Sequence, residues 1–333
     1  MENNNNDVYL TTQGNEQVYV LQPKAQTPYP QMPQQKPQPQ GPSKGRKVGA
    51  VFISLIPWAI LQVVQTVVMI GVILVCGYDD IMEIIERGRI SDMTDFIDVI
   101  ADSIGLTMLI YGIISAIGLG IFYMVKYVKF KELGSNLKNI GWRFWLAAPI
   151  AVIGAQLFAQ GFVRLYQSIP IFEKLQEMLY SNNPMYEALN DTNNLSVPMV
   201  LGVVIFVPIA EELAFRGIPG GILRKAGHSM KFILIFTALF FAIAHGNIAQ
   251  IIYVAVLGFA EGYMFVHKKT IIPTILMHMF YNFLGTMPAI EKFFEAMPLP
   301  SMALFMCAGL VIVAGAFFLA KSSLKKEIPV NAA

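Results

Sequence analysis

The chain has 333 residues, of which 55% are hydrophobic and only 14% are charged, with a net charge of +2. Soluble proteins carry about a quarter charged residues, so this composition, with a mean hydropathy of +0.54, argues against a soluble protein and predicts an integral membrane protein surrounded by lipid. The balance of charge excludes a basic footprint for nucleic acid. Cys76 and Cys307 lie in or beside apolar runs, where cysteines act as small hydrophobic residues.

Residues 1–47 differ from the rest of the chain. They include "NNNN" and "PYPQMPQQKPQPQGP" and no sustained apolar pattern. Such a segment cannot bury enough apolar surface to offset the entropy lost on ordering, so we predict a disordered cytoplasmic tail rich in Asn, Gln and Pro. Its Pro-rich part is a candidate docking segment for a partner, although a purely solvated tail is the favoured interpretation.

Eight apolar runs follow, each near the ~20 residues that cross the hydrocarbon layer of a bilayer. The predicted fold is therefore an all-α, polytopic membrane helical bundle of about eight transmembrane helices. The fifth run is short and the sixth follows it closely, so these two are expected to form a tight helical hairpin. The predicted spans are 48–76, 104–125, 144–165, 195–224, 232–247, 249–266, 270–287 and 300–320.

Lysine and arginine residues gather before the first span and in every second connection after it, which places these segments and both termini in the cytoplasm. The intervening loops are acidic. After the tail, the predicted organisation is an N-terminal group of transmembrane helices with acidic outer loops (48–194), a core (195–287), and a last transmembrane helix with a basic C-terminal tail (288–333).

Four polar residues from three predicted helices fall at a similar depth. Counted at 1.5 Å per residue from the basic helix ends, Glu211, His245 and Asn282 lie roughly 20 Å from the cytoplasmic face, and His278 roughly 14 Å from it. His278 and Asn282 are four residues apart and therefore share one helix face. Ionisable residues inside membrane spans are costly and usually functional, so this shared depth predicts a site.

Glu212 and Arg216 are also four residues apart, and an ion pair between them would let both remain buried. Glu211 then faces something else, and a carboxylate held away from bulk water is a better general base. Imidazole and carboxamide groups can hold water or stabilise an oxyanion. Two alternatives stay open, namely interhelical hydrogen bonding alone and a transport or proton-relay site. Glu261 is a further ionisable group without an assigned role, which either snorkels or pairs with a basic residue.

Three motifs carry a resemblance to a known family. The sequence "EELAFRG" (residues 211–217) matches an EExxxR motif, "FAIAH" (241–245) matches FxxxH, and "HMFYN" (278–282) matches HxxxN. In this order they resemble the CPBP family, the CAAX-processing and bacteriocin-processing intramembrane proteases. The resemblance covers roughly residues 195–285 and identifies this segment as the catalytic core.

The resemblance implies peptide-bond hydrolysis inside the membrane by an endopeptidase. Glu211 would activate the attacking water, and His245 would help to hold that water. His278 and Asn282 would stabilise the oxyanion, while Glu212 and Arg216 would have structural or orienting roles. The site would have to reach water and substrate through a cavity.

A metal is an open alternative. Glu211, His245 and His278 form a ligand set that zinc uses in other hydrolases, and the family has long carried a metalloprotease label. No HExxH pair occurs in the chain, and an amide oxygen such as that of Asn282 binds zinc weakly. A metal-free glutamate mechanism without a cofactor is therefore favoured, with zinc as the alternative.

The expected partners are membrane lipid and a peptide or membrane-associated protein substrate. The alternatives to a protease are a non-catalytic membrane scaffold or a protein conferring immunity to a bacteriocin, and less readily a transporter. The Asn/Gln-rich tail on a compact body favours a bacterial plasma membrane and a processed peptide as substrate.

Overall fold

The structure is a computed structural model, which describes residues 6–13, 16–23, 42–86, 93–128, 140–180, 195–268 and 270–322. The chain divides into two compact units, residues 1–41 and 42–333, and each is described by itself.

The first unit contains a β-hairpin where the sequence predicted a disordered tail. Strands β1 (Asn6–Gln13) and β2 (Glu16–Pro23) pair antiparallel, with Gln13 opposite Glu16. Both are rich in Val, Tyr and Leu, which favour strands, and Gly-Asn lies between them, a pair typical of two-residue hairpin loops. The prediction was wrong for this stretch because the composition of the whole tail concealed two short strands. The Pro-rich stretch 24–41 lies outside the described residues.

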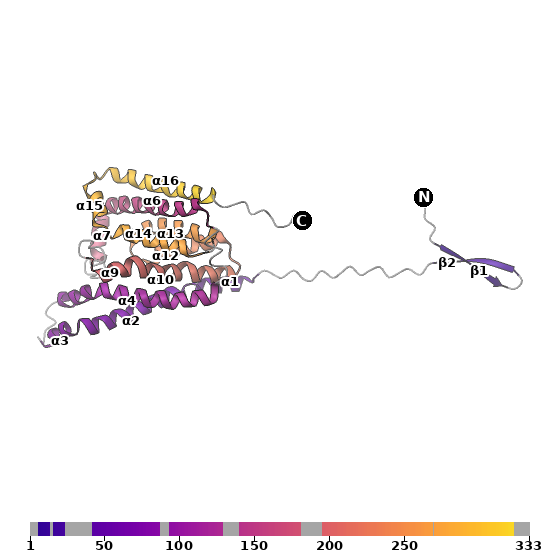
Figure 1. The fold of residues 1–333 in the computed structure, drawn as a ribbon, viewed down its shortest axis with the longest axis horizontal. Helices are drawn as coiled ribbons and strands as arrows, with labels where there is room; N and C mark the ends of the chain where they lie inside the picture. The colour runs from indigo at the N-terminus through magenta and orange to yellow at the C-terminus, as the bar shows by residue number, and fades with distance from the viewer. Residues whose placement is uncertain are drawn as a thin grey trace. The chain divides into compact units, whose positions relative to one another are not determined.

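In the second unit the described residues are helical and lie side by side in a bundle (Figure 1), which confirms the predicted all-α fold. Helix α16 packs on α6 at one edge and α2 packs on α4 at the other. The elements are α1 (Lys44–Ile53), α2 (Ile56–Cys76), α3 (Tyr78–Glu86), α4 (Met93–Tyr127), α6 (Trp142–Gln167), α7 (Pro170–Tyr180), α9 (Val197–Leu201), η1 (Gly202–Phe206), α10 (Val207–Glu212), η2 (Leu213–Gly217), α11 (Ile218–Lys225), α12 (Met230–Ala244), α13 (Ile248–Lys268), α14 (Ile272–Gly285), α15 (Pro288–Ala296) and α16 (Ser301–Ser322).

Six helices in the described part of the chain are long and apolar enough to cross a membrane, so the chain is an integral membrane protein. They cover 44–76, 103–127, 142–167, 197–225, 248–267 and 301–322. The predicted count of eight is not confirmed, because the fifth and seventh predicted spans are the helices α12, with 15 residues, and α14, with 14. At 1.5 Å per residue they are about 22 Å and 21 Å long, shorter than the ~30 Å hydrocarbon layer.

The predicted hairpin of the fifth and sixth runs is present, since α12 and α13 pack against each other across a three-residue connection. His245 ends α12, and Gly246 follows with a φ of +70°, a conformation that glycine adopts without strain. Asn247 Oδ1 then accepts hydrogen bonds from the N–H groups of Ala249 (2.9 Å) and Gln250 (3.2 Å) at the start of α13. These bonds satisfy two of the backbone N–H groups at the start of α13, which have no partner within the helix.

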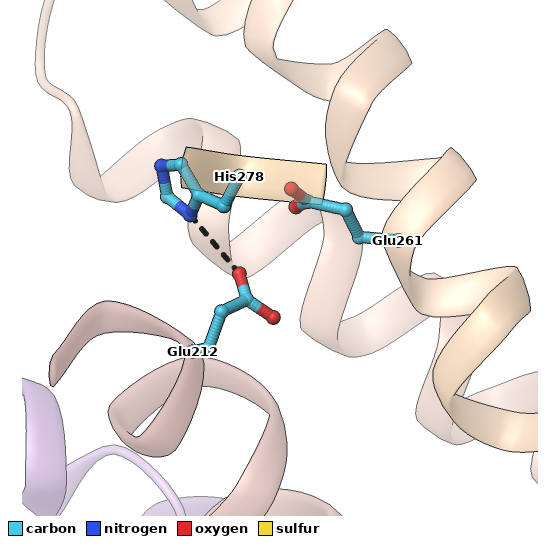
Figure 2. Close-up of side chains that lie close together, drawn as sticks. All are labelled: Glu212, Glu261 and His278. Carbon is cyan, nitrogen blue, oxygen red and sulfur yellow. Dashed lines mark hydrogen bonds and ion pairs between the residues drawn. The ribbon is translucent and has the colours of Figure 1, made fainter. Parts of the chain in front are cut away.

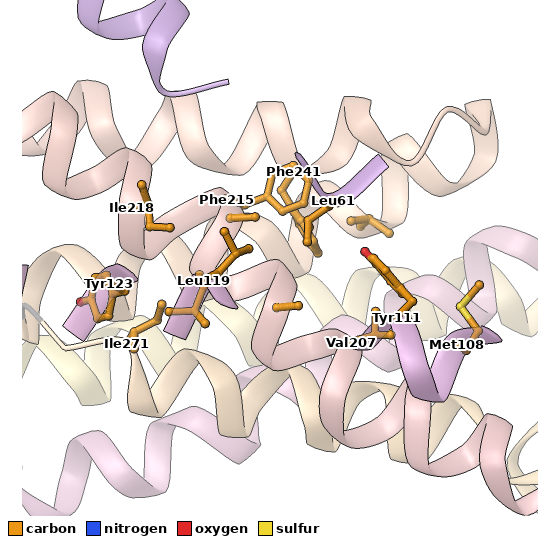
Figure 3. Packing of buried hydrophobic residues seen from close by; sticks show 14 of the residues in the cluster. Leu61, Met108, Tyr111, Leu119, Tyr123, Val207, Phe215, Ile218, Phe241 and Ile271 are labelled. Carbon is orange, nitrogen blue, oxygen red and sulfur yellow. The ribbon is translucent and has the colours of Figure 1, made fainter. Parts of the chain in front are cut away.

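The helix that carries the paired glutamates is held closely by α4. A Cβ atom at Gly202 would lie 2.7 Å from the backbone carbonyl carbon of Met108, so the two backbones touch there. Such close approach is the usual means by which membrane helices associate. Figure 3 shows Tyr111 of α4, Val207 of α10 and Phe241 of α12 in the buried apolar cluster that surrounds this contact. The apolar cluster fixes the glutamate helix against its neighbours.

Candidate active site

Glu211 and Glu212 end a short α-helical segment, α10, that lies between two π-helical segments. In the first of these, η1, the N–H of Val207 donates to the carbonyl oxygen of Gly202, five residues earlier. The following residue, Pro208, has no N–H to donate to the carbonyl oxygen of Val203. Asn282 of α14 donates from Nδ2 to that oxygen instead, at 2.9 Å. Single π-helical turns of this kind are frequent at functional sites.

A buried ion-pair network lies directly behind Glu211. Glu212, Arg216 and Glu261 are completely buried. One terminal nitrogen of Arg216, Nη1, contacts Glu212 Oε1, and the other, Nη2, lies 2.8 Å from Glu261 Oε2. The predicted pair of Glu212 and Arg216 is therefore present. Of the two alternatives predicted for Glu261, pairing with a basic residue is the one observed, and the partner is Arg216.

His278 connects this network to Glu211. Its Nδ1 lies 3.1 Å from Glu212 Oε1, the interaction drawn in Figure 2. Its other ring nitrogen, Nε2, lies 3.4 Å from Glu211 Oε2. The side chain of Glu211 is 22% exposed, whereas that of Glu212 is fully buried. The two adjacent carboxylates thus differ: Glu212 is buried against one ring nitrogen of His278, and the partly exposed Glu211 lies near the other.

Phe241, the first residue of the second motif, joins both histidines. Its ring centroid lies 4.8 Å from that of His245 and 5.3 Å from that of His278, both with edge-to-face geometry. The guanidinium carbon of Arg216 lies 4.4 Å from the same ring centroid. His245 donates from Nδ1 to the carbonyl oxygen of Phe241 at 2.8 Å. When the ring is neutral, Nε2 is the acceptor nitrogen.

The structure therefore places His245 and His278 against one phenylalanine, with Glu211 beside His278. Residues 193–284, which include every residue of this site, match the family model of type II CAAX prenyl endopeptidases, Rce1-like. The chain carries a Rce1-like domain. This agrees with the resemblance to CAAX-processing proteases that the three motifs indicated. No curated protein and no solved structure matched the chain.

Within the Rce1-like domain, one group of described residues could hold a metal ion. The ligand atoms of Glu212, Glu261 and His278 lie within 4.8 Å of one another, and all three residues are buried. This is not the expected zinc set, in which Glu211 and His245 joined His278. Arg216 already places a positive charge between the two carboxylates of the group. A divalent cation would have to approach that guanidinium closely, so these residues fit Arg216 better than they fit a metal.

Phe241 and Glu261 make contacts within the site that were not predicted from the sequence. Phe241 lies four residues before His245, and this spacing alone indicates a shared helix face. The position of Glu261 could not be found in this way, because its partner lies on another helix and no motif links them. Asn282 was expected to face an oxyanion, and one of its N–H groups is engaged by Val203.

Proposed function

We propose that the chain is an intramembrane endopeptidase in which Glu211 activates water for attack on a peptide bond. The observation that carries this proposal is the difference between the paired glutamates. Glu212 is buried against Arg216 and His278, whereas Glu211 is partly exposed and has His278 Nε2 at 3.4 Å. A general base must reach water, and the developing charge needs a stabilising group nearby; the partial exposure of Glu211 and its nearness to His278 support this role.

In the proposed reaction a water molecule gives one proton to Glu211 while its oxygen bonds to the carbonyl carbon of the substrate. His245 accepts a hydrogen bond from that water at Nε2, because Nδ1 is engaged by Phe241. His278, protonated on both ring nitrogens, donates Nδ1–H to Glu212 and Nε2–H to the oxyanion, and the second N–H of Asn282 also donates to the oxyanion. The carbon–nitrogen bond then breaks, and Glu211 returns its proton to the leaving amine. The products are a carboxylic acid and an amine, and no metal takes part.

Glu212 and Arg216 have orienting roles in this proposal. Glu212 Oε1 holds Nδ1 of the His278 ring, which directs Nε2 toward Glu211. Fixing a histidine through its second nitrogen in this way sets both the orientation of the ring and the position of its protons.

The match to CAAX prenyl endopeptidases makes a protein with a prenylated cysteine near its C-terminus one substrate class. A peptide without a prenyl group, processed in a bacterial plasma membrane, is the other, and it fits the Asn/Gln-rich composition of the tail. The two classes share the scissile peptide bond and differ in the lipid group.

The test uses full-length protein in lipid vesicles with internally quenched peptides, one carrying a farnesylated cysteine and a matched one without farnesyl. Glu211→Gln keeps the size of the side chain but removes the base, so we expect kcat to fall by about 10²–10⁴-fold. The matched control is Glu295→Gln on α15, an exposed carboxylate outside the site.

Cleavage of both peptides at the wild-type rate by Glu211→Gln would refute the mechanism. If wild-type protein cleaves neither peptide, membrane proteomes of cells with wild-type protein and with Glu211→Gln are compared. Identical peptide profiles would then favour a scaffold or immunity protein over a protease.

A further inference from the structure

Glu261 is a buried carboxylate that the proposed reaction does not use. It comes from the middle of α13, whereas the paired glutamates belong to the helix 197–225. Its side chain is completely buried. Transfer of an unpaired carboxylate into such a place is strongly unfavourable, so a glutamate at this position requires a specific partner.

That partner is Arg216, and it is the one ion-pair partner of Glu261 in the described part of the chain. The distance from Glu261 Oε2 to Arg216 Nη2 is 2.8 Å. The second terminal nitrogen of the same guanidinium contacts Glu212. Because the guanidinium is planar and rigid, holding one nitrogen determines where the other one lies. The Phe241 ring, 4.4 Å away, supports the guanidinium further.

The contact of Arg216 with Glu212 affects the histidine next to it. Glu212 Oε1 is the atom that meets both Arg216 Nη1 and His278 Nδ1. The position of this oxygen therefore depends on the guanidinium, and the orientation of the His278 ring depends on the oxygen. Figure 2 shows Glu261 and Glu212 on two separate helices, both directed toward the region of His278.

We propose that Glu261 is a positioning residue, which holds Arg216 so that Glu212 keeps His278 directed at Glu211. The path runs from Glu261 through Arg216, Glu212 and His278, and every step is a contact between side-chain atoms. Glu261 itself is completely buried and acts in this proposal only through Arg216. The kinetic part of this proposal rests on the proposed protease function, whereas the orientation of the His278 ring does not.

The opposing interpretation is that Glu261 only stabilises the bundle. Both interpretations predict a loss of stability when the carboxylate is removed, so stability does not separate them. They differ in the ring of His278, which a purely stabilising residue leaves unchanged in the molecules that are folded.

The kinetic test compares Glu261→Gln, Glu261→Asp and Gln156→Leu with wild-type protein on the quenched peptide that wild type cleaves. Glu261→Gln removes the charge, and weakening one charged contact corresponds to a fall in kcat of about 10–100-fold with unchanged KM. Glu261→Asp keeps the charge on a shorter side chain and should regain part of that loss. Gln156 is a buried polar residue of α6 outside the ion-pair network of Arg216, so Gln156→Leu should keep the wild-type kcat.

The second test observes the ring directly and needs no substrate. Protein labelled with ¹⁵N-histidine is reconstituted in lipid bilayers, and the four histidines are resolved by solid-state NMR, with His278→Ala assigning the signals of His278. We expect the Nδ1 and Nε2 signals of His278 to shift in Glu261→Gln and to keep their wild-type positions in Gln156→Leu.

Unchanged His278 signals in folded Glu261→Gln, or a wild-type kcat, would overturn the proposal. If Glu261→Gln does not fold, Glu261→Asp takes its place in both tests under the same criteria. Shifted His278 signals, together with no peptide cleavage and identical membrane proteomes for wild type and Glu211→Gln, would support the positioning role and count against the protease function, so the two failures are distinguishable.

Discussion

Replacement of Arg216 by methionine tests the buried network most severely. The substitution keeps an unbranched side chain of similar length but removes the guanidinium that contacts both Glu212 and Glu261. Two carboxylates whose oxygens lie within 4.8 Å of a common histidine nitrogen then share an apolar interior. We expect the folded state to be strongly destabilised.

The magnitude follows from the contacts. At an effective dielectric constant of ~20, a pair of unit charges about 4 Å apart attracts by ~4 kcal/mol, and Arg216 makes two such contacts. The cost of burying the guanidinium offsets much of this attraction, so removal of one partner from a buried pair typically destabilises by about 3–5 kcal/mol. We expect a loss in this range, which corresponds to a decrease in Tm of roughly 5–15 °C.

The assay is thermal unfolding of purified protein in one detergent, followed by tryptophan fluorescence. Arg224→Met is the matched control, because Arg224 also lies over an aromatic ring, that of Phe265 at 5.0 Å, and donates to the carbonyl oxygen of Gly220. Its loss leaves no carboxylate unpaired among the described residues. A Tm of Arg216→Met equal to that of Arg224→Met would refute the reasoning that Arg216 compensates two buried charges.

Three further outcomes are expected. Gly202→Val should lower Tm and activity, because a Cβ atom at this position would lie 2.7 Å from the backbone of α4. Gly118→Val should change neither, because the space around Gly118 is open. Equal Tm values for the two variants would contradict the packing described. Asn282→Asp should destabilise more than Asn282→Ser, because an ionised carboxylate cannot donate to the Val203 carbonyl, and the reverse order in thermal unfolding would argue against this contact. Activity on the quenched peptides should survive complete metal removal, verified by elemental analysis, and its loss and recovery with zinc alone would establish a metal mechanism.

Hydropathy and motif spacing predicted much of this molecule. The apolar runs placed the helices of the bundle, since a span needs about 20 apolar residues whatever its partners are. The spacing of four residues placed Glu212 against Arg216. Such information is local and is present in every short segment of the sequence.

What the sequence did not predict depends on contacts between distant segments or on backbone geometry. Glu261 could be recognised as ionisable, but its pairing with Arg216 requires the crossing of α13 with another helix. The fifth apolar run was recognised as short but still counted as a span, and the composition of residues 1–47 concealed the hairpin of β1 and β2. The π-helical segments have no hydropathy signature, since one added residue changes hydrogen bonding and leaves composition unaltered.

The segment η1 determines which way the acidic pair points. A π-helical turn contains one more residue than the α-helical turn it replaces, and each residue of a helix advances the side chains by about 100°. Deleting Val204 would allow an ordinary helix to form with nearly the same apolar composition. It would also rotate the part of this helix before residue 204 by about 100° relative to Glu211. Either Gly202 would then no longer face α4, or the Glu211 carboxylate would no longer face His278. The site therefore requires a particular rotation of this helix about its own axis, in addition to the two glutamates that the helix carries.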